Sequence, residues 1–336
     1  MIVTLKPAVA DSELAAVKDR LNNLGCRLTE VRTQRGHYLI AGIHGEPDLR
    51  VIGALPGVLD VHRVSDAYKL VSRKWKAVPT TINLGDGVEI TEGGLALIAG
   101  PCSIESREQM QAIITHLQQE GLRIMRGGAF KPRTSPYAFR GLRTEGLKLS
   151  HELARAAGIK LVSEVLSAEQ IELMYDYVDI YQVGTRNSQN FELLLELGKV
   201  DKPVLLKRGM SSTLDELLQS AEYVFANGNE ALILCERGIR TFEPAYRNTL
   251  DLNAIPALKE KSHLPVIVDP SHGVGVRRWV ESLALAGIMA GADGVMYEVA
   301  PEPERALSDG QQTLCFPESS ELIKKARQTF ELRQRF

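Results

Sequence analysis

The chain has 336 residues, which is enough for two domains or for one barrel with an appended domain. With 44% hydrophobic and 24% charged residues, it has an ordinary globular composition that excludes collagen-like, disordered and disulfide-scaffold classes. Lys and Arg number 40 and Asp and Glu 42, so the net charge of −2 provides no overall basic field for nucleic acid or an anionic membrane. Any anion-binding site must therefore be local.

The four cysteines are widely spaced and form no CxxC pair: Cys26, Cys102, Cys235 and Cys315. This pattern indicates neither a disulfide framework nor a thiolate zinc finger, and it favours a reducing compartment. The first 13 residues lack a charged region followed by an apolar run, and apolar runs such as residues 95–100 are far shorter than a membrane span. We expect a soluble, cytoplasmic protein.

Residues 1–68 predict a small domain of strands and helices in the order βαββαβ. The predicted strands are 2–5, 27–34, 37–42 and 58–64, and the predicted helices are 12–24 and 46–54. This order is that of a ferredoxin-like domain, which supports many unrelated functions. A polar linker is expected over 69–80, and the rest of the chain, 81–336, forms a second domain. That domain opens with a hairpin around Gly85 and Gly87, which we expect to close one end of the structure that follows.

From residue 95 onward, short apolar runs alternate with segments of helical length. The eight runs are 95–102, 123–128, 160–165, 178–184, 203–209, 231–238, 265–273 and 294–300. Eight strands, each followed by a helix, predict an α/β protein with a (β/α)8 TIM barrel, preceded here by the small α+β ferredoxin-like domain. A doubly wound open sheet is the alternative. The barrel is favoured because nearly every run ends in a polar residue suited to chemistry, and such barrels carry their active sites at the carboxyl ends of the strands.

Six cations follow the predicted strands: Arg126, Lys131, Arg133, Arg186, Lys207 and Arg237. In a barrel they would converge on one mouth, where their mutual repulsion requires an anionic partner. Guanidinium groups bind phosphate and carboxylate in a bidentate manner, so this set indicates ligands with more than one such group. Any one of these side chains taken alone is more often a solvated surface charge.

Four residues of metal-ligand type lie at the same predicted mouth: Cys102, His272, Glu298 and Asp309. Mixed sulfur, nitrogen and oxygen donors suit manganese, iron or zinc better than magnesium. Taken alone, Cys102 reads equally well as a small apolar residue, and Asp309 as a turn residue before Gly310. The run from Asp269 through His272 places a carboxylate, a hydroxyl and an imidazole at one strand end, which indicates a catalytic loop.

Residues 95–316 closely resemble the 3-deoxy-D-arabino-heptulosonate 7-phosphate (DAHP) synthases, which open the shikimate pathway of aromatic amino acid biosynthesis. The resemblance rests on GPCS, GGAFKPRTSP, VGTRNSQN, LLKRG, RTFEPAYRNTLDL, VIVDPSHGVG and YEVAPEPERALSDGQQ, in the family's order and spacing. KPRTS matches the family's aldose-phosphate motif. That stretch differs in the related 3-deoxy-D-manno-octulosonate 8-phosphate synthases, which remain a minor alternative.

The resemblance implies three sets of site residues. Cys102, His272, Glu298 and Asp309 would bind an essential divalent metal, of which Mn²⁺, Fe²⁺, Zn²⁺ and Co²⁺ are candidates. The phosphate of phosphoenolpyruvate would lie against Arg186, Arg237 and the backbone near Thr185, and its carboxylate among Arg126, Lys131 and Lys207. The phosphate of erythrose 4-phosphate would lie against Arg133, Thr134 and Ser135, with Asp269 near the sugar hydroxyls.

The implied reaction joins the methylene carbon of phosphoenolpyruvate to the aldehyde of erythrose 4-phosphate, adds water at the enol carbon and releases phosphate. A metal is suited to polarising the aldehyde oxygen or to acidifying a water. Lys131 is our candidate proton donor to the nascent alkoxide, because an ammonium crowded by arginines loses its proton more readily. Asp309 or Glu164 would handle the water.

Two functions of other classes remain open. A Schiff-base aldolase would use Lys207 or Lys131 to form an imine with a carbonyl substrate. A non-catalytic sensor would bind an amino acid through residues 1–68 and keep the barrel only as a scaffold. The resemblance also implies a homotetramer and feedback inhibition by an aromatic amino acid through the N-terminal domain, although such a domain is often only an oligomerisation surface.

Overall fold

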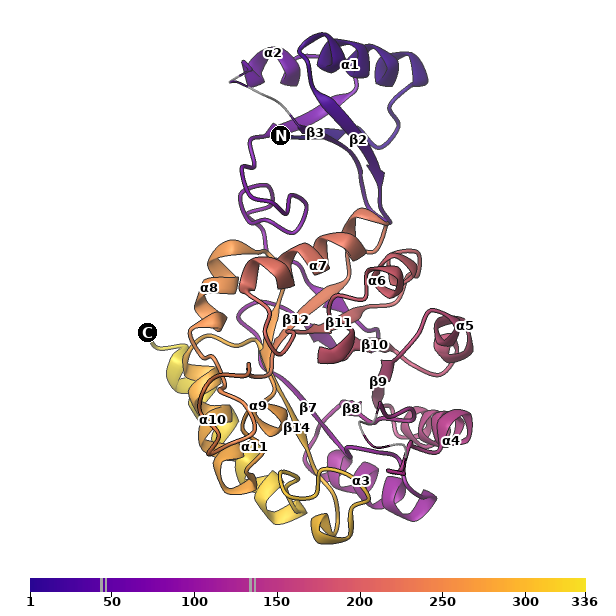
Figure 1. Ribbon diagram of the computed structural model, residues 1–336, viewed down its shortest axis with the longest axis vertical. Coiled ribbons are helices and arrows are strands. Elements are labelled where there is room, and N and C mark those ends of the chain that lie inside the picture. Colours follow the sequence, from indigo (N-terminus) through magenta and orange to yellow (C-terminus); the bar gives the residue numbers. More distant parts are fainter. Residues whose placement is uncertain (43–44, 46, 133–134, 136) are drawn as a thin grey trace.

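The computed structural model describes residues 1–42, 45, 47–132, 135 and 137–336. It consists of a small sheet with two helices, at the top of Figure 1, and a closed eight-stranded barrel surrounded by helices. The predicted fold class is therefore confirmed, and the open-sheet alternative is wrong because the first and last barrel strands pair with each other. Among the described residues, no helix is long and apolar enough to cross a membrane.

The small sheet has four antiparallel strands in the order β2-β3-β1-β4. Its elements are β1 (Ile2–Leu5), α1 (Asp11–Asn23), β2 (Arg27–Arg32), β3 (His37–Gly42), α2 (Leu49–Gly53) and β4 (Val58–His62). In α1 the buried residues Leu14, Val17 and Leu21 recur at intervals of three and four, which places them on one face of the helix. That face packs on the sheet around the fully buried Leu39.

The segment predicted as a polar linker packs closely on the barrel. Leu70 and Val71 are fully buried, and their backbone N–H groups donate to the carboxylate of Glu222 at 2.9 and 3.0 Å. His263 Nε2 lies 2.8 Å from the carbonyl oxygen of Leu70, and its Nδ1 lies 2.8 Å from Thr80 Oγ1. The polar composition concealed this packing, because a few apolar side chains are enough to anchor a short segment.

The small sheet contacts the barrel at the end opposite the carboxyl ends of its strands. Glu230, which precedes a barrel strand, accepts hydrogen bonds from the hydroxyls of Thr33 and Tyr38. The backbone N–H of Gln34 donates to the carbonyl oxygen of Gly228 at 3.0 Å. The Tyr38 ring also meets Trp75 edge to face, with 5.2 Å between ring centroids. Hydrogen bonds and aromatic packing thus hold the two parts together.

The barrel strands are parallel and each pairs with the next along the chain. They are β7 (Ala96–Gly100), β8 (Ile124–Arg126), β9 (Lys160–Val165), β10 (Ile180–Val183), β11 (Val204–Lys207), β12 (Leu232–Glu236), β13 (Val266–Val268) and β14 (Gly294–Glu298). The surrounding helices are α3 (Arg107–Gln119), α4 (Arg143–Ala156), α5 (Glu169–Tyr175), α6 (Phe191–Leu197), α7 (Leu214–Ala226), α8 (Ala254–Lys261), α9 (Pro270–Val274), α10 (Arg277–Met289) and α11 (Phe316–Arg333). Two 3₁₀ turns, η1 (Thr185–Asn187) and η2 (Pro303–Arg305), lie in the loops.

A short hairpin of β5 (Ile82–Asn83) and β6 (Glu89–Ile90) closes the amino-terminal end of the barrel. Ile82, Val88 and Ile90 are buried against inward-facing strand residues such as Ile98 and Met296. Burial of each such side chain contributes about 1.5–3 kcal/mol. The barrel interior is therefore filled at its amino-terminal end, and its open end is the one formed by the carboxyl ends of the strands.

The seventh apolar run differs from its predicted form, because the strand stops at Val268 and a short helix, α9, begins at Pro270. The side chain of Asp269 accepts from the backbone N–H of His272 at 3.0 Å and caps the helix, and proline fits its first turn. This turn brings His272 to the barrel mouth.

Candidate active site

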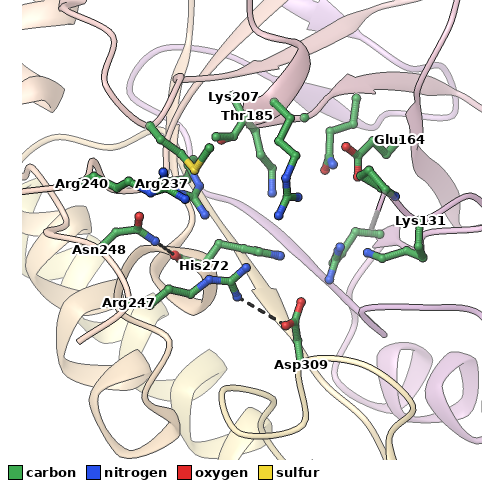
Figure 2. Close-up of a pocket in the computed structure, with 16 residues that line it drawn as sticks. Lys131, Glu164, Thr185, Lys207, Arg237, Arg240, Arg247, Asn248, His272 and Asp309 are labelled. Atoms are coloured by element: carbon green, nitrogen blue, oxygen red, sulfur yellow. Dashed lines mark hydrogen bonds and ion pairs between the residues drawn. The ribbon is translucent and has the colours of Figure 1, made fainter. Parts of the chain in front are cut away.

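A cavity of about 330 Å³ opens at the carboxyl ends of the barrel strands. Figure 2 shows Lys131 and Glu164 on one wall and Arg240, Arg247 and Asn248 on the opposite one. The lining residues are Arg126, Lys131, Pro132, Glu164, Gln182, Gly184, Thr185, Arg186, Lys207, Met210, Arg237, Arg240, Arg247, Asn248, His272 and Asp309. The structure thus brings together most of the residues that the sequence assigned to one mouth.

Three of the cations are almost completely buried, and their pairing is incomplete. Arg126 Nη1 is 2.6 Å from Glu298 Oε1, and Lys207 Nζ is 2.5 Å from Asp269 Oδ2. Arg126 Nε, however, is the one buried side-chain nitrogen or oxygen in the described residues without a hydrogen-bond partner. Arg237 donates only to the neighbouring carbonyl of Gly238, at 3.2 Å, and forms no ion pair within the described ranges.

Burial without an ion-pair partner makes the charged form of Arg237 less favourable and lowers the pKa of its guanidinium. An unpaired buried cation is costly unless a ligand supplies the opposite charge. Arg186, in contrast, is exposed at the cavity rim beside Thr185, whose hydroxyl donates to the carbonyl oxygen of Arg208 at 2.8 Å. The cavity is therefore suited to an anion that reaches from the rim to the buried guanidinium groups.

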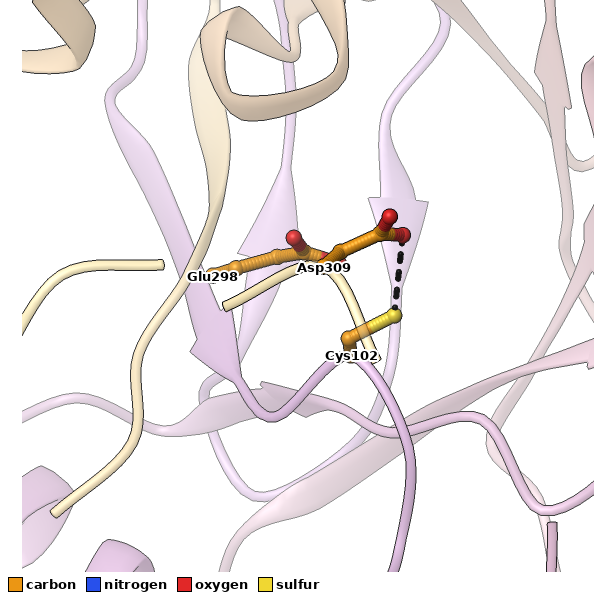
Figure 3. Close-up of side chains that lie close together, drawn as sticks. All are labelled: Cys102, Glu298 and Asp309. Atoms are coloured by element: carbon orange, nitrogen blue, oxygen red, sulfur yellow. Dashed lines mark hydrogen bonds between the residues drawn. The ribbon is translucent and has the colours of Figure 1, made fainter. Parts of the chain in front are cut away.

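Three of the four residues of metal-ligand type form a compact group beside this cavity, and His272 contacts one of them. Ligand atoms of Cys102, Glu298 and Asp309 lie within 4.8 Å of one another. Figure 3 shows these three side chains close together. Cys102 Sγ is 3.2 Å from Asp309 Oδ2, and His272 Nε2 is 3.3 Å from Glu298 Oε1. Cys102 follows β7, Glu298 ends β14, Asp309 lies in the next loop and His272 lies on α9.

The chemistry of these four residues fits a divalent transition metal. His272 Nδ1 is 2.8 Å from Asp269 Oδ2, which leaves Nε2 facing the other donors. Burial lowers the pKa of His272 despite the nearby carboxylates, which favours the neutral form of the imidazole that coordinates a metal. Burial also raises the pKa of the Cys102 thiol to about 12, and the adjacent Glu298 carboxylate adds to the effect. A bound cation would offset this cost and release the thiol proton.

The carboxylates beside these donors remain ionised although they are buried. Burial opposes the charge on Glu298, but His272 and Arg126 outweigh it and hold the pKa of that carboxyl below its usual value. Burial likewise opposes the charge on Asp269, whereas His272 and Lys207 hold its pKa well below the usual range. The site therefore presents two buried carboxylates whose charged form is favoured by their neighbours.

Two glycines make room for functional side chains. A Cβ on Gly128 would lie 2.7 Å from Lys131 Cδ, and Lys131 Nζ donates to the carbonyl oxygen of Cys102 at 3.0 Å. A Cβ on Gly184 would overlap the carboxylate of Glu164 and lie 2.7 Å from its Cδ. Real Cβ atoms do not approach this closely, so the glycines allow Lys131 and Glu164 to take their places along the cavity.

The predicted erythrose 4-phosphate residues are only partly placed. Arg133 and Thr134 lie outside the described residues. Ser135 is exposed, does not line the cavity and accepts from the backbone N–H of Tyr137 at 3.3 Å. Asp269 is completely buried, and its oxygens contact Lys207 and His272. Its predicted contact with sugar hydroxyls stays a prediction.

Sequence reasoning missed several polar residues of the site: Gln182, Arg240, Arg247, Asn248 and Gln312. Both arginines lie in the segment RTFEPAYRNTLDL, residues 240–252, and a count of cations along that segment would have found them. Gln312 had no such signal, because its importance lies in a contact with Glu298 that only the fold creates.

The comparisons with known proteins agree with one another. Residues 78–335 match the model of the DAHP synthetase I family. The chain is 45% identical over 333 residues to a phospho-2-dehydro-3-deoxyheptonate aldolase from Thermotoga maritima, covering 97% of each chain. A crystal structure of the DAHP synthase of that organism superposes with a TM-score of 0.79 at 43% identity, covering 98% of this chain and 97% of the other. A 2-dehydro-3-deoxyphosphooctonate aldolase from Syntrophotalea carbinolica is 30% identical over 270 residues, covering 74% of this chain and 95% of the relative.

Proposed function

Because this chain belongs to the DAHP synthetase I family, we propose that it condenses phosphoenolpyruvate with erythrose 4-phosphate and water to give DAHP and phosphate. The resemblance found in the motifs is confirmed, as is the assignment as a transferase of the DAHP synthase type. The observation that carries the proposal is the unpaired buried guanidinium of Arg237, together with the orphan Nε of Arg126, beside a converging set of metal donors. The place in the shikimate pathway and the cytoplasmic location stay predictions.

Phosphoenolpyruvate has two anionic groups, and the cations of the cavity match them. Its phosphate would lie between Arg237 and the rim residues Thr185 and Arg186. Its carboxylate would lie near Arg126, Lys131 and Lys207. Fixing both groups orients the methylene carbon toward the second substrate and overcomes the repulsion between two phosphorylated molecules, which is the main positioning contribution to the rate.

Cys102, His272, Glu298 and Asp309 would hold the divalent metal. Donor atoms of Cys102, Glu298 and Asp309 already converge, His272 Nε2 contacts Glu298, and Asp269 orients the imidazole. When bound, the metal supplies Lewis-acid chemistry that polarises the aldehyde oxygen or acidifies a water. The ion's identity is not fixed by this donor set, since Mn²⁺, Fe²⁺, Zn²⁺ and Co²⁺ all accept mixed ligands.

Lys131 and Glu164 would carry the protons, together with Asp309. Lys131 Nζ lies beside Cys102, next to the metal donors, and would give a proton to the oxygen that is an aldehyde in the substrate and an alcohol in the product. Glu164 lies against Gly184 on the cavity wall and would accept a proton from the water that attacks the enol carbon. Asp309 is the other candidate for that water.

The phosphate of the aldose phosphate would bind to Arg133, Thr134 and Ser135. The 30% identity to a phosphooctonate aldolase keeps a five-carbon sugar phosphate as the second candidate substrate. The higher identity over nearly the whole chain, and the KPRTS segment, favour erythrose 4-phosphate.

The two other function classes find less support. Lys207 is buried in an ion pair with Asp269, and Lys131 donates to a backbone carbonyl, so neither is the free amine that imine formation needs. The full set of cations and metal donors argues against a non-catalytic sensor. Borohydride with substrate present inactivates an imine enzyme and spares a metal-dependent synthase.

We further propose that residues 1–68 mediate feedback inhibition by an aromatic amino acid in a homotetramer. The small sheet contacts the barrel through Thr33 and Tyr38, on the side away from the cavity. An effector would act by favouring another arrangement of the domain, one that restricts access to the mouth. Tyrosine and phenylalanine are the effectors to test.

The proposed activity is tested by following the loss of phosphoenolpyruvate absorbance with each candidate sugar phosphate. The proposal predicts consumption with erythrose 4-phosphate and little with arabinose 5-phosphate. The reverse preference would assign the protein to the sister reaction, and no consumption with either sugar would favour the sensor function.

A further inference from the structure

Arg247 and Gln312 connect the loops around the proposed metal site, and neither residue is itself a metal donor. One guanidinium nitrogen, Arg247 Nη1, is 2.8 Å from Gln312 Oε1 and 3.4 Å from Asp309 Oδ1. Gln312 is completely buried, and its Nε2 donates to Glu298 Oε2 at 2.8 Å. Arg247, from the β12–α8 loop, therefore contacts one carboxylate of the proposed donor set directly and is linked to the other through Gln312.

In each of the two carboxylates, Arg247 or Gln312 contacts one oxygen, and another proposed metal donor lies near the second oxygen. In Asp309, Oδ1 contacts Arg247, whereas Oδ2 accepts from Cys102 Sγ at 3.2 Å. In Glu298, Oε2 contacts Gln312, whereas Oε1 lies 3.3 Å from His272 Nε2. The same Oε1 also pairs with Arg126 Nη1 at 2.6 Å. In each carboxylate, Arg247 or Gln312 thus contacts one oxygen, and the other oxygen lies next to another proposed donor.

The same arginine also packs against the helix that carries His272. Its backbone N–H donates to the carbonyl oxygen of Val274, at the end of α9, at 3.1 Å. Gly275, with φ of +70°, leaves the space that the side chain needs, since a Cβ there would lie 2.6 Å from Arg247 Cβ. The next residue, Asn248, donates from Nδ2 to the carbonyl oxygen of His272 at 3.0 Å. Arg247 is therefore anchored where three of the four proposed donors meet.

From this geometry we propose that Arg247 and Gln312 are positioning residues that orient Asp309 and Glu298 for the divalent metal. The inference rests on the proposed metal role of those carboxylates. Partners of this kind, which orient a ligand by hydrogen bonds, typically change metal affinity by 10- to 100-fold when they are removed. Arg247 is also partly exposed at the cavity, with 33% of its side chain accessible, so its charge alone would oppose cation binding.

The charge of Arg247 and its proposed positioning contacts have opposite effects on metal affinity. Removing a positive charge near a cation site strengthens metal binding by electrostatics alone. Loss of the proposed positioning contacts weakens it instead. Arg240 is a matched control, because it lines the same cavity and has no hydrogen bond to a metal donor in the described part of the chain. Arg240→Met therefore reports the electrostatic effect without the positioning effect.

The test is equilibrium dialysis of the metal-stripped protein against Mn²⁺, with wild type, Arg247→Met, Arg247→Lys, Gln312→Met and Arg240→Met. We expect roughly 10- to 100-fold weaker binding for Arg247→Met and Gln312→Met. The Mn²⁺ affinity of Arg247→Lys should fall between those of these variants and wild type, because lysine keeps the positive charge and one nitrogen that donates hydrogen bonds. Arg240→Met should bind Mn²⁺ as tightly as wild type or more tightly.

The absorption spectrum of the Co²⁺ form provides a readout of ligand geometry that does not depend on activity. It should change in Arg247→Lys and Gln312→Met, measured at saturating Co²⁺, and remain that of wild type in Arg240→Met. Thermal unfolding of the metal-free proteins identifies a variant that fails to fold, in which case Arg247→Lys decides the question. Unchanged affinity and spectrum in Arg247→Lys and Gln312→Met would overturn the positioning role while leaving the proposed function intact. A wild-type protein that binds no Mn²⁺ or Co²⁺ would overturn both.

Discussion

Substitution of Gly184 by alanine should damage catalysis while leaving the fold intact. The backbone at Gly184 has φ of −71°, which alanine adopts without strain. The added Cβ would overlap Glu164 Oε1 and lie 2.7 Å from Cδ, so the carboxylate must move. The displaced atoms are the end of a flexible side chain, which can rotate away at little cost in stability.

The size of the effect follows from that displacement. A Cβ needs at least 3.0 Å, so the carboxylate shifts by on the order of 1 Å, and misplacement of that size costs about 100-fold in rate. The assay compares kcat and the midpoint of thermal unfolding for Gly184→Ala and for Gly53→Ala. A Cβ on Gly53 would meet only Val61, at 3.9 Å, so this control should match wild type in kcat. Wild-type kcat in Gly184→Ala would refute the role of Glu164, and a large loss of stability would refute the view that the carboxylate gives way.

Three further predictions concern protons and the N-terminal domain. Lys131→Met should lower kcat by roughly 100- to 10,000-fold with unchanged metal content, because Lys131 Nζ binds the carbonyl oxygen of Cys102 and not its thiol. Lys160→Met, at the other end of the barrel, is its control, and near-normal kcat in Lys131→Met would exclude the proton-donor role. Burial lowers the pKa of His263 to about 4. Between about pH 4 and pH 6.5, this imidazole is therefore neutral in the folded protein and protonated in the unfolded chain. The free energy of unfolding should therefore fall by about 3 kcal/mol as the pH drops from 6.5 to below 4. Denaturant titrations of wild type and His263→Gln measure this contribution, and equal pH dependence in the two would contradict it. Deletion of residues 1–68 should abolish inhibition by tyrosine or phenylalanine and keep activity, since a truncated form of the Thermotoga maritima synthase covering 79% of this chain has been solved. Inhibition that persists after the deletion would place the effector site in the barrel.

The sequence was informative wherever one residue type recurs at one structural position. Eight apolar runs predicted the eight barrel strands, and the polar residues that end them predicted which side chains share the mouth. The convergence of Cys102 and Asp309 was predictable for the same reason, because both follow strands that end at the same rim. The end of the strand at Val268 was harder to predict. The signal that ends it is the capping of α9 by Asp269, and this signal is local and lies within an apolar run.

Contacts between side chains from different loops could not be predicted in this way. The contacts of the Asp269 carboxylate with Lys207 and His272 were not predicted from the sequence. Arg247 and Gln312 are separated by 65 positions and meet only because two loops cross the same rim. The packing of Leu70 and Val71 was hidden by the polar residues around them. Such contacts depend on distances across the fold, which composition and periodicity do not encode.

The central claim is a metal-dependent condensation at the barrel mouth. Its most direct measurement is the release of phosphate and formation of DAHP from phosphoenolpyruvate and erythrose 4-phosphate, by protein stripped with EDTA and then supplied with Mn²⁺. We predict no turnover in the stripped protein, recovery with Mn²⁺, and no recovery in a Cys102→Ala variant that still folds. Equal turnover by the stripped and the reconstituted protein would contradict the account.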